Sequence, residues 1–120
     1  MELSSKQQYI QRIEVAHTLL TTTNLTTFYT APSGDDFTSA VVESILVCDH
    51  DNQQTKITLT VTNEGVVYTL FKELNITAYN TVEMLTKNIF LHQGDIIKIQ
   101  ANRAGNLTVY ASITEYAKGD

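Results

Sequence analysis

The sequence predicts an all-β protein, an antiparallel β-sandwich of jelly-roll-like form with an N-terminal arm. Its composition is the first reason, because threonine, valine, isoleucine, tyrosine and phenylalanine are abundant, and these side chains fit a pleated sheet. Alternation is the second reason. In the stretch KITLTVT, Ile57, Leu59 and Val61 fall on one face and the threonines between them fall on the other. Polar turn segments also divide the alternating stretches at short intervals, which is typical of a sandwich.

The expected strands follow one another along almost the whole chain. They lie near residues 13–20, 25–30, 39–48, 55–62, 66–72, 73–78, 81–86, 89–92, 95–101 and 106–116. Some of these segments can fuse, so we expect about seven to nine strands. The only candidate helix is in residues 3–12. Its apolar residues make too thin a stripe, and we prefer an extended arm there.

Turn residues separate these strands. Asn and Asp tolerate left-handed φ, and glycine takes positive φ without steric cost, as expected at 63–65, 92–95 and 102–105. The chain has one proline, Pro32, in the stretch APSG. Because proline cannot lie inside a central strand, we expect residues 31–34 to form a corner that leads into a buried strand. Substitution of Gly34 is expected to be costly if that residue has a positive φ.

Length, charge and cysteine content describe one globular domain. The chain has 120 residues, 42% of them hydrophobic, and a net charge of −5. We expect residues 1–14 to form the arm and residues 15–120 a single β-sandwich domain. An acidic chain lacks the basic face of a nucleic-acid binder or of a protein that docks on anionic lipid, so neither partner is expected. Cys48 is alone, and the N-terminus lacks the apolar run of a signal peptide, which favours assembly in a cytoplasm.

The acidic loop at 49–52 is the strongest candidate for chemistry. Asp49, Asp51 and Gln53 alternate as the ligands of a hard cation can, but the glycine and the distal glutamate of a calcium loop are missing. Adjacent strand-end residues point apart, so Asp49 and His50 are poorly placed to share an ion. Carboxylates could also meet across a groove, as glycosidases require, but the short chain has no lid-like insertion. We therefore expect a solvated hairpin turn, and no metal, cofactor or catalytic residue.

The other candidates each have a structural interpretation. His17, His50 and His92 lack the spacing of zinc ligands. Cys48 and His50 lie two strand positions apart, too far for a direct hydrogen bond, so Cys48 is expected to be a buried, inert thiol. The six tyrosines could form a sugar-stacking platform, although packing within strands is the preferred interpretation.

Several motifs together carry a resemblance to a known family. They are FYTAPSG, SAVVESILVCDHD, LHQGDIIKIQA and NLTVYASITEY, which lie within residues 25–116. These stretches resemble a family of small β-sandwich virion proteins of tailed bacteriophages, some of which are similar to head decoration, or cement, proteins. The chain departs from the family at Asp49 and His50, where Asn-Thr-like residues are frequent. The N-terminal 24 residues lie outside the resemblance.

The resemblance implies a non-enzymatic virion structural protein, and within that class a capsid decoration protein that stabilises the head. A neck, tail or baseplate component and a carbohydrate-binding receptor-recognition module are the alternatives. Expected partners are the major capsid protein or other virion proteins and further copies of this chain. A trimer is favoured because it would match the local threefold positions of a shell. Tyr9, Ile10 and Ile13 are the expected contacts with another subunit, since they are the apolar residues near the end of a polar arm.

Overall fold

The computed structural model describes residues 11–34 and 36–117, and these residues form nine strands and no helix. The strands are β1 (Gln11–Leu19), β2 (Thr26–Thr30), β3 (Phe37–Asp49), β4 (Thr55–Asn63), β5 (Val66–Ile76), β6 (Thr81–Glu83), β7 (Ile89–Leu91), β8 (Ile96–Ala101) and β9 (Leu107–Ala117). The described part of the chain thus offers no helix that could cross a membrane. The predicted all-β class is confirmed, and the strands lie close to the predicted ranges.

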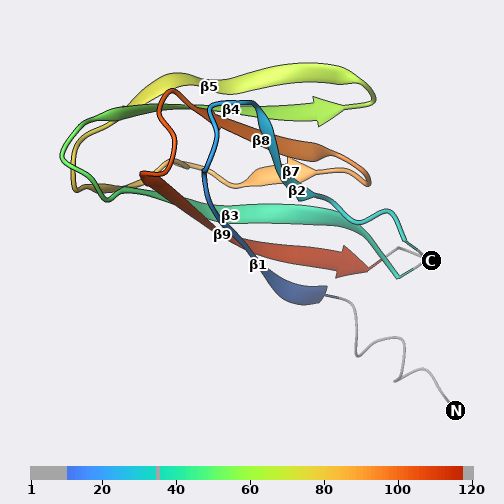
Figure 1. The fold of residues 1–120 in the computed structure, drawn as a ribbon. Helices are drawn as coiled ribbons and strands as arrows, with labels where there is room; N and C mark the ends of the chain where they lie inside the picture. Colours follow the sequence, from blue (N-terminus) through green and yellow to red (C-terminus); the bar gives the residue numbers. More distant parts are fainter. Residues whose placement is uncertain (1–10, 35, 118–120) are drawn as a thin grey trace, which may run out of the picture.

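The strands form two antiparallel sheets packed face to face (Figure 1). Sheet A has the order β1-β9-β3-β6, and β7 also pairs with β3. Sheet B has the order β2-β8-β4-β5. The loops between strands gather at the two ends of the sandwich. Each sheet presents one side to the core and the other side outward.

One set of strand pairs is nested along the chain, and the pairs β3–β9 and β4–β8 join this set side by side within the sheets. β1 pairs with β9, β2 with β8, β3 with β6 and β7, and β4 with β5. The chain is therefore one long antiparallel hairpin whose tip is the β4–β5 turn. Successive pairs of this hairpin fall alternately in sheet A and sheet B. Such a rolled hairpin is a jelly roll, the form that the sequence predicts.

Strand β5 joins two of the predicted segments, 66–72 and 73–78, into one strand. The register with β4 shifts between Ile57 and Leu59, and Glu73 of β5 has a φ of 52°. An extra residue is therefore taken up as a β-bulge, which bends the strand without ending it.

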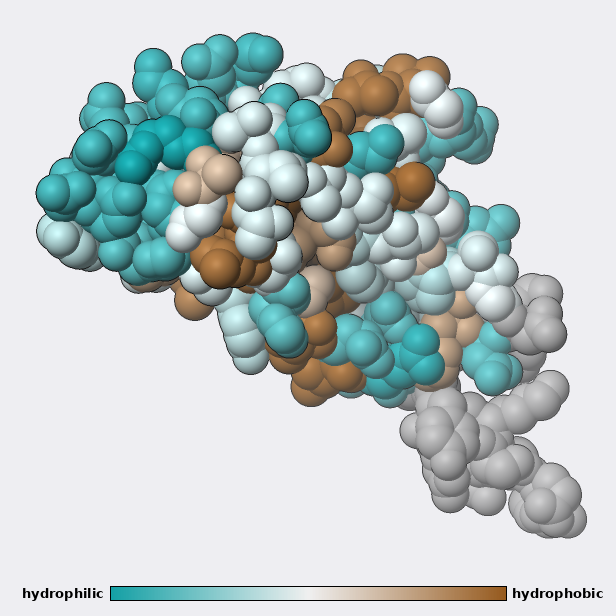
Figure 2. Space-filling model, viewed as in Figure 1, coloured by the Kyte–Doolittle hydropathy of each residue, from teal (hydrophilic) through white to brown (hydrophobic). Residues whose placement is uncertain are grey.

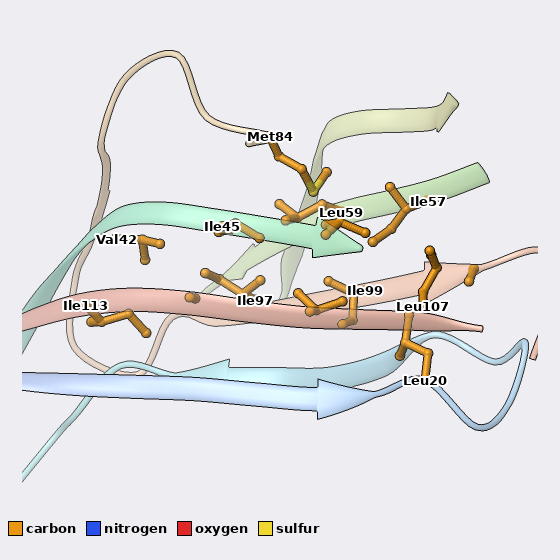
Figure 3. Close-up of a cluster of buried hydrophobic side chains, with 14 of the residues drawn as sticks. Leu20, Val42, Ile45, Ile57, Leu59, Met84, Ile97, Ile99, Leu107 and Ile113 are labelled. Carbon is orange, nitrogen blue, oxygen red and sulfur yellow. The ribbon is translucent and has the colours of Figure 1, made fainter. Parts of the chain in front are cut away.

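The core fills the space between the sheets (Figure 3). Most of its side chains are the inward-facing residues that alternate with outward-facing ones along the strands. Ile45 and Val47 of β3, Leu59 of β4 and Ile99 of β8 belong to one buried cluster and have no exposed surface. Complete burial of such a side chain stabilises the fold by about 1.5–3 kcal/mol. A slip of one residue would turn the whole inward set of a strand outward, so the core also fixes the register.

Glycine turns close the strands where the sequence predicts them. Gly65, Gly94 and Gly105 have φ values of 81°, 77° and 84°, in the region that other L-residues avoid. Glu64 and Tyr79 also have positive φ, of 50° and 59°.

Residues 31–34 form the connection from β2 into β3, as expected from Pro32. Backbone hydrogen bonds attach this corner to the β7–β8 turn: the amide of Ala31 donates to the Asp95 carbonyl at 2.8 Å, and the amide of Gly94 donates to the Ala31 carbonyl at 3.2 Å. Gly34 does not have a positive φ, and a Cβ there would meet no atom within 4 Å. The condition for a costly substitution at Gly34 is therefore not met.

Strand β1 contains part of the segment that we expected to be an arm. Residues 11–14 pair with residues 113–116 of β9. Residues 1–10, including Tyr9 and Ile10, lie outside the described residues.

The two kinds of glycine lead to a prediction. Gly94→Ala should lower the free energy of unfolding by about 1 kcal/mol, because a Cβ is strained at positive φ. Gly34→Ala is the matched control and should have no cost of that kind. Urea denaturation of both variants measures the difference, and equal losses would show that the turn at Gly94 does not require positive φ.

Candidate interaction surface

The acidic loop at 49–52 is a capped turn between β3 and β4. Asp49 is fully buried, whereas His50 is exposed, so the two side chains point apart as expected. The carboxylate of Asp49 accepts a hydrogen bond from the amide of Asp51 at 3.1 Å, and that of Asp51 accepts one from the amide of Gln53 at 2.7 Å. These side chains cap their own backbone, as Asp does in turns.

A polar network ties this turn to the β8–β9 loop. Nη2 of Arg103 donates to the carboxylate of Asp51 at 2.8 Å, and Nη1 donates to the carbonyl of Gln53 at 3.0 Å. Asn106 donates to Asp49 at 3.5 Å. The backbone hydrogen bond from Gln53 and then the bond from Arg103 hold the pKa of Asp51 below its ordinary value. The arrangement closes one end of the sandwich, where hydrophilic side chains gather at the left of Figure 2.

The network offers few ligands to a hard cation. Its buried side-chain oxygens that accept no hydrogen bond are Oδ2 of Asp49 and Oδ1 of Asn106. Calcium takes about six to eight oxygens. Among residues 11–34 and 36–117, no group of three or more His, Cys, Asp or Glu side chains is arranged to hold a metal ion.

The histidines and the cysteine lie on separate elements. His17 on β1 stacks on Tyr110 of β9, with ring centroids 6.1 Å apart. Nδ1 of His92 lies 3.8 Å from the carboxylate of Asp95. Cys48 is partly exposed, so the expectation of a buried thiol is wrong. Its register partner in β9 is Thr108, and both lie on the outward side of sheet A.

The buried carboxylate of Glu115 joins the two sheets near the end of the sandwich opposite the loop at 49–52. Glu115 on β9 is 5% exposed and accepts hydrogen bonds from Nε of Arg12, at 2.7 Å, and from the hydroxyl of Tyr29. Tyr29 belongs to sheet B, so this bond crosses the sandwich. Burial first, and then the bond to Glu115, raise the pKa of Tyr29, which keeps its hydroxyl protonated. The guanidinium of Arg12 also lies over the ring of Phe37, 4.0 Å from its centroid.

The outward side of sheet A forms a broad surface, which we call the sheet A face. Register partners on adjacent strands share one side of a sheet, so its members follow from the pairing. They are Gln11, Ile13, Val15, His17 and Leu19 of β1, Thr108, Tyr110, Ser112, Thr114 and Tyr116 of β9, Ser39, Val41, Ser44, Leu46 and Cys48 of β3, Thr81 and Glu83 of β6, and Phe90 of β7. Two of its apolar side chains are almost free of contacts: Ile13 is 79% exposed and Phe90 is 74% exposed.

The sheet A face carries no lysine, arginine or aspartate. It does carry carboxylates, because Glu83 of β6 is the register partner of Leu46, and Glu43 of β3 reaches Thr114 on the same side. Glu43 accepts a hydrogen bond from the hydroxyl of Thr114 at 3.1 Å, and Glu83 accepts one from the amide of Ile45 at 2.8 Å. The outward side of sheet B is different, since it carries threonines and Lys98. Exposed aromatic and aliphatic side chains gathered on one face are typical of a protein–protein contact.

A second apolar surface lies on β5 near the tip of the β4–β5 hairpin. Val66, Val67, Tyr68 and Leu70 are between 45% and 53% exposed. Brown, apolar side chains gather in this region at the upper right of Figure 2. β5 is the edge strand of sheet B, but its register with β4 is irregular near these residues. Irregular register is one way in which proteins prevent an edge strand from pairing with another chain.

The described tyrosines do not gather into one platform for a sugar. Tyr29 points toward Glu115, Tyr68 lies on β5, Tyr79 lies in the turn between β5 and β6, and Tyr110 and Tyr116 lie on the sheet A face. A shallow hollow of about 210 Å³ on the outward side of sheet B is lined by Thr23, Lys56, Thr58, Lys72, Glu73, Gln100, Ala101 and Asn102. None of these residues is aromatic, so the hollow lacks the stacking surface of a sugar site.

The predicted contact residues divide between described and undescribed parts of the chain. Ile13 lies on the sheet A face and is highly exposed, but Tyr9 and Ile10 lie outside the described residues. Contact of these three residues with another subunit stays a prediction. The rest of the face was not predicted, because its members come together only through the pairing of distant strands.

Comparison with known proteins shows the fold of the chain. No family model and no curated protein matches it. A chain of the T13 IBDV viral particle has a TM-score of 0.57 and 12% identity, with coverage of 88% of this chain and 31% of that chain. A chain from the structure of the infectious bursal disease virus Gx strain has a TM-score of 0.55 and 10% identity, with coverage of 92% and 33%. This chain thus spans about a third of the length of those two chains.

A third likeness is to a chain of the cyanophage Pam1 capsid asymmetric unit. It has 16% identity and covers 92% of this chain and 88% of that chain, but its TM-score of 0.46 is too low to inform the fold further.

The bond between the sheets leads to a prediction about Tyr29. Tyr29→Phe should lower the free energy of unfolding by about 1–3 kcal/mol, because Glu115 loses a donor inside the sandwich. Tyr79→Phe is the control, since Tyr79 is 70% exposed. Because folding raises the pKa of Tyr29, its contribution is complete below the ordinary tyrosine pKa of about 10 and is lost as the pH rises above it. Denaturation at pH 7 measures the effect, and an equal loss in both variants would contradict the role of Tyr29.

The small number of free oxygens leads to a prediction about metal. Addition of EDTA should leave the melting temperature of the purified protein unchanged, and elemental analysis should find no stoichiometric ion. A melting temperature that falls with chelator and recovers with calcium would show that Asp49 and Asp51 hold a cation.

Proposed function

We propose that this protein is a non-enzymatic structural component of a bacteriophage virion, and that it is a decoration protein bound to the outside of the capsid. The single observation that carries the virion role is the jelly-roll fold, which resembles a chain of the T13 IBDV viral particle with a TM-score of 0.57. The motifs that resemble small phage virion proteins support the narrower assignment to a bacteriophage.

The distribution of side chains supports a binding role. The titratable clusters of the described residues are the two polar networks, and both are engaged in joining strands and loops. The sheet A face, by contrast, presents a broad surface with exposed apolar side chains such as Ile13 and Phe90. A broad surface of this kind fits another protein better than it fits a small substrate, which needs a concave site.

The proposed partners are the major capsid protein and further copies of this chain. A trimer at the local threefold positions of the shell is the form that we favour. In that arrangement Tyr9, Ile10 and Ile13 would contact the neighbouring subunit. Such a contact would add apolar anchors to the polar N-terminal residues.

Binding to heads tests this proposal. Purified phage heads that lack the protein should bind it in a fixed number of copies per head, which electron microscopy with labelled protein can count. Removal of residues 1–10 should weaken the binding, and the shortened protein should still melt cooperatively. The deletion stops at residue 10 because residues 11–14 pair with β9.

The location of the label decides between the assignments. Label on tails or baseplates would replace the decoration role with the tail alternative. Saturable binding to a glycan array, with no label on particles, would favour a carbohydrate-binding module. Absence of the protein from purified virions would contradict the proposed function.

A further inference from the structure

We propose that strand β1 pairs through its free edge with β1 of a second copy, antiparallel and about a twofold axis, so that sheet A of one copy continues into sheet A of the other. The contact is made by backbone groups at the side of the sandwich. It goes beyond the proposed function and does not rest on it. Together with the proposed threefold contact, it would give six copies.

β1 is an edge strand whose free side is long and regular. It lies at one end of sheet A (Figure 1), and its nine residues pair with β9 without a shift of register. The other edge strands of the described chain are short or irregular: β6 and β7 have three residues each, and the registers of β2 and β5 shift. Short strands and irregular register prevent pairing at an edge, and β1 has neither of these safeguards.

The free edge of β1 presents backbone groups at alternate residues. The amide of Leu20, the residue after β1, donates to the carbonyl of Leu107 at 3.0 Å, so the backbone of Leu20 points toward β9. The direction of hydrogen bonding alternates along an antiparallel pair, and the register is unbroken, so the even-numbered residues of β1 also face β9. The odd-numbered residues, from Gln11 to Leu19, therefore face the free edge. Their N–H and C=O groups have no strand partner within the described part of the chain.

A second copy of β1 matches these backbone groups over the whole strand. When two copies run antiparallel about a twofold axis at Val15, residue 15 faces residue 15 of the other copy, 13 faces 17, and 11 faces 19. Each edge-facing N–H then meets a carbonyl of the other copy. All nine residues of both strands are covered, and neither copy keeps an open edge at this side.

The side chains of β1 also match those of a second copy. The outward row is apolar, since Ile13, Val15 and Leu19 are 79%, 46% and 46% exposed. A twofold axis through the sheet keeps outward residues with outward residues, so Val15 meets Val15 and Ile13 meets His17 of the other copy. Such cross-strand apolar pairs stabilise a sheet.

The charges of β1 fit this pairing. On the inward side, Arg12 faces Thr18 of the other copy and Glu14 faces Ala16, so no like charges lie opposite each other. An axis at Glu14 would instead set two carboxylates opposite each other, which is unfavourable. Inward charges can protect an edge from pairing. Here, however, Nε of Arg12 lies 2.7 Å from Glu115 and 3.4 Å from Glu14, so the guanidinium is paired within each copy.

These features favour a second copy over an unrelated occupant. An unrelated strand would have to supply nine residues with an apolar outward row and no acidic residue opposite Glu14, whereas a second copy supplies all of these by symmetry. The outward carboxylates of Glu43 and Glu83 do not oppose the contact. They lie on β3 and β6, at least two strands from β1, which is about 10 Å.

Proline substitution tests the contact, because it distinguishes the two sides of β1. The wild-type protein should sediment as an even number of copies. Val15→Pro removes an N–H that faces the free edge and should weaken the twofold association roughly tenfold or more, since each copy loses a central hydrogen bond. Ala16→Pro is the matched control: it removes an N–H that faces β9, so it should lower the melting temperature more than Val15→Pro does.

A second variant covers the case in which Val15→Pro does not fold. Val15→Lys sets two like charges opposite each other at the axis and should weaken the association several-fold. Val67→Lys places the same charge on β5, at a position that is 53% exposed, and should leave the association unchanged. A wild-type monomer or trimer would overturn the proposal, and so would an even-numbered assembly that neither substitution of Val15 weakens.

Cross-linking tests the register. In a Cys48→Ser background, Val15→Cys should form a disulfide between copies, because paired residues have Cα atoms about 5.5 Å apart, within the span of a disulfide. Leu19→Cys should not, because the two copies of residue 19 would lie about 27 Å apart. Cross-linking of Leu19→Cys without that of Val15→Cys, or of neither variant, would contradict a twofold axis at Val15.

Discussion

The nested pairing of the strands is the constraint on which the rest of the structure depends. The short turn at Gly65 brings β4 and β5 together, and every later pair lies farther from that turn along the chain, ending with β1 and β9. The pairs fall alternately in two sheets, so the inward residues of both sheets meet in one core. The core then fixes the register of each strand, because a slip by one residue would expose its apolar side chains.

Polar networks at the two ends complete this arrangement and leave the outward faces for contacts with partners. Arg103 and Asp51 join loops at one end, and Glu115 joins the sheets near the other. Buried polar groups need such partners, so these charged side chains have structural roles. Ile13 and Phe90, on the outward side of sheet A, are exposed and have no comparable structural role within the domain. This contrast supports the proposed role in assembly.

Local signals in the sequence predict most of the fold, and long-range contacts explain what they miss. The alternation of residues around Ile57 and the glycines of the turns are signals carried by neighbouring residues. The strands and turns were therefore predictable. Glu115 lies 103 positions from Arg12, and their hydrogen bond could not be predicted without the pairing of β1 with β9. The sheet A face has the same origin, although one exposed member, Ile13, was singled out. Cys48 was misjudged because the sequence does not say which side of β3 faces the core.

Hydrogen–deuterium exchange of the protein alone and bound to heads that lack it tests the central claim, that the sheet A face is the assembly surface, most directly. Association should slow exchange in peptides from β1, β7 and β9, because water is excluded from their outward side, and exchange at 64–70 should be unchanged. Slower exchange confined to 64–70, with β1 and β9 unaffected, would contradict the claim and place the contact on β5.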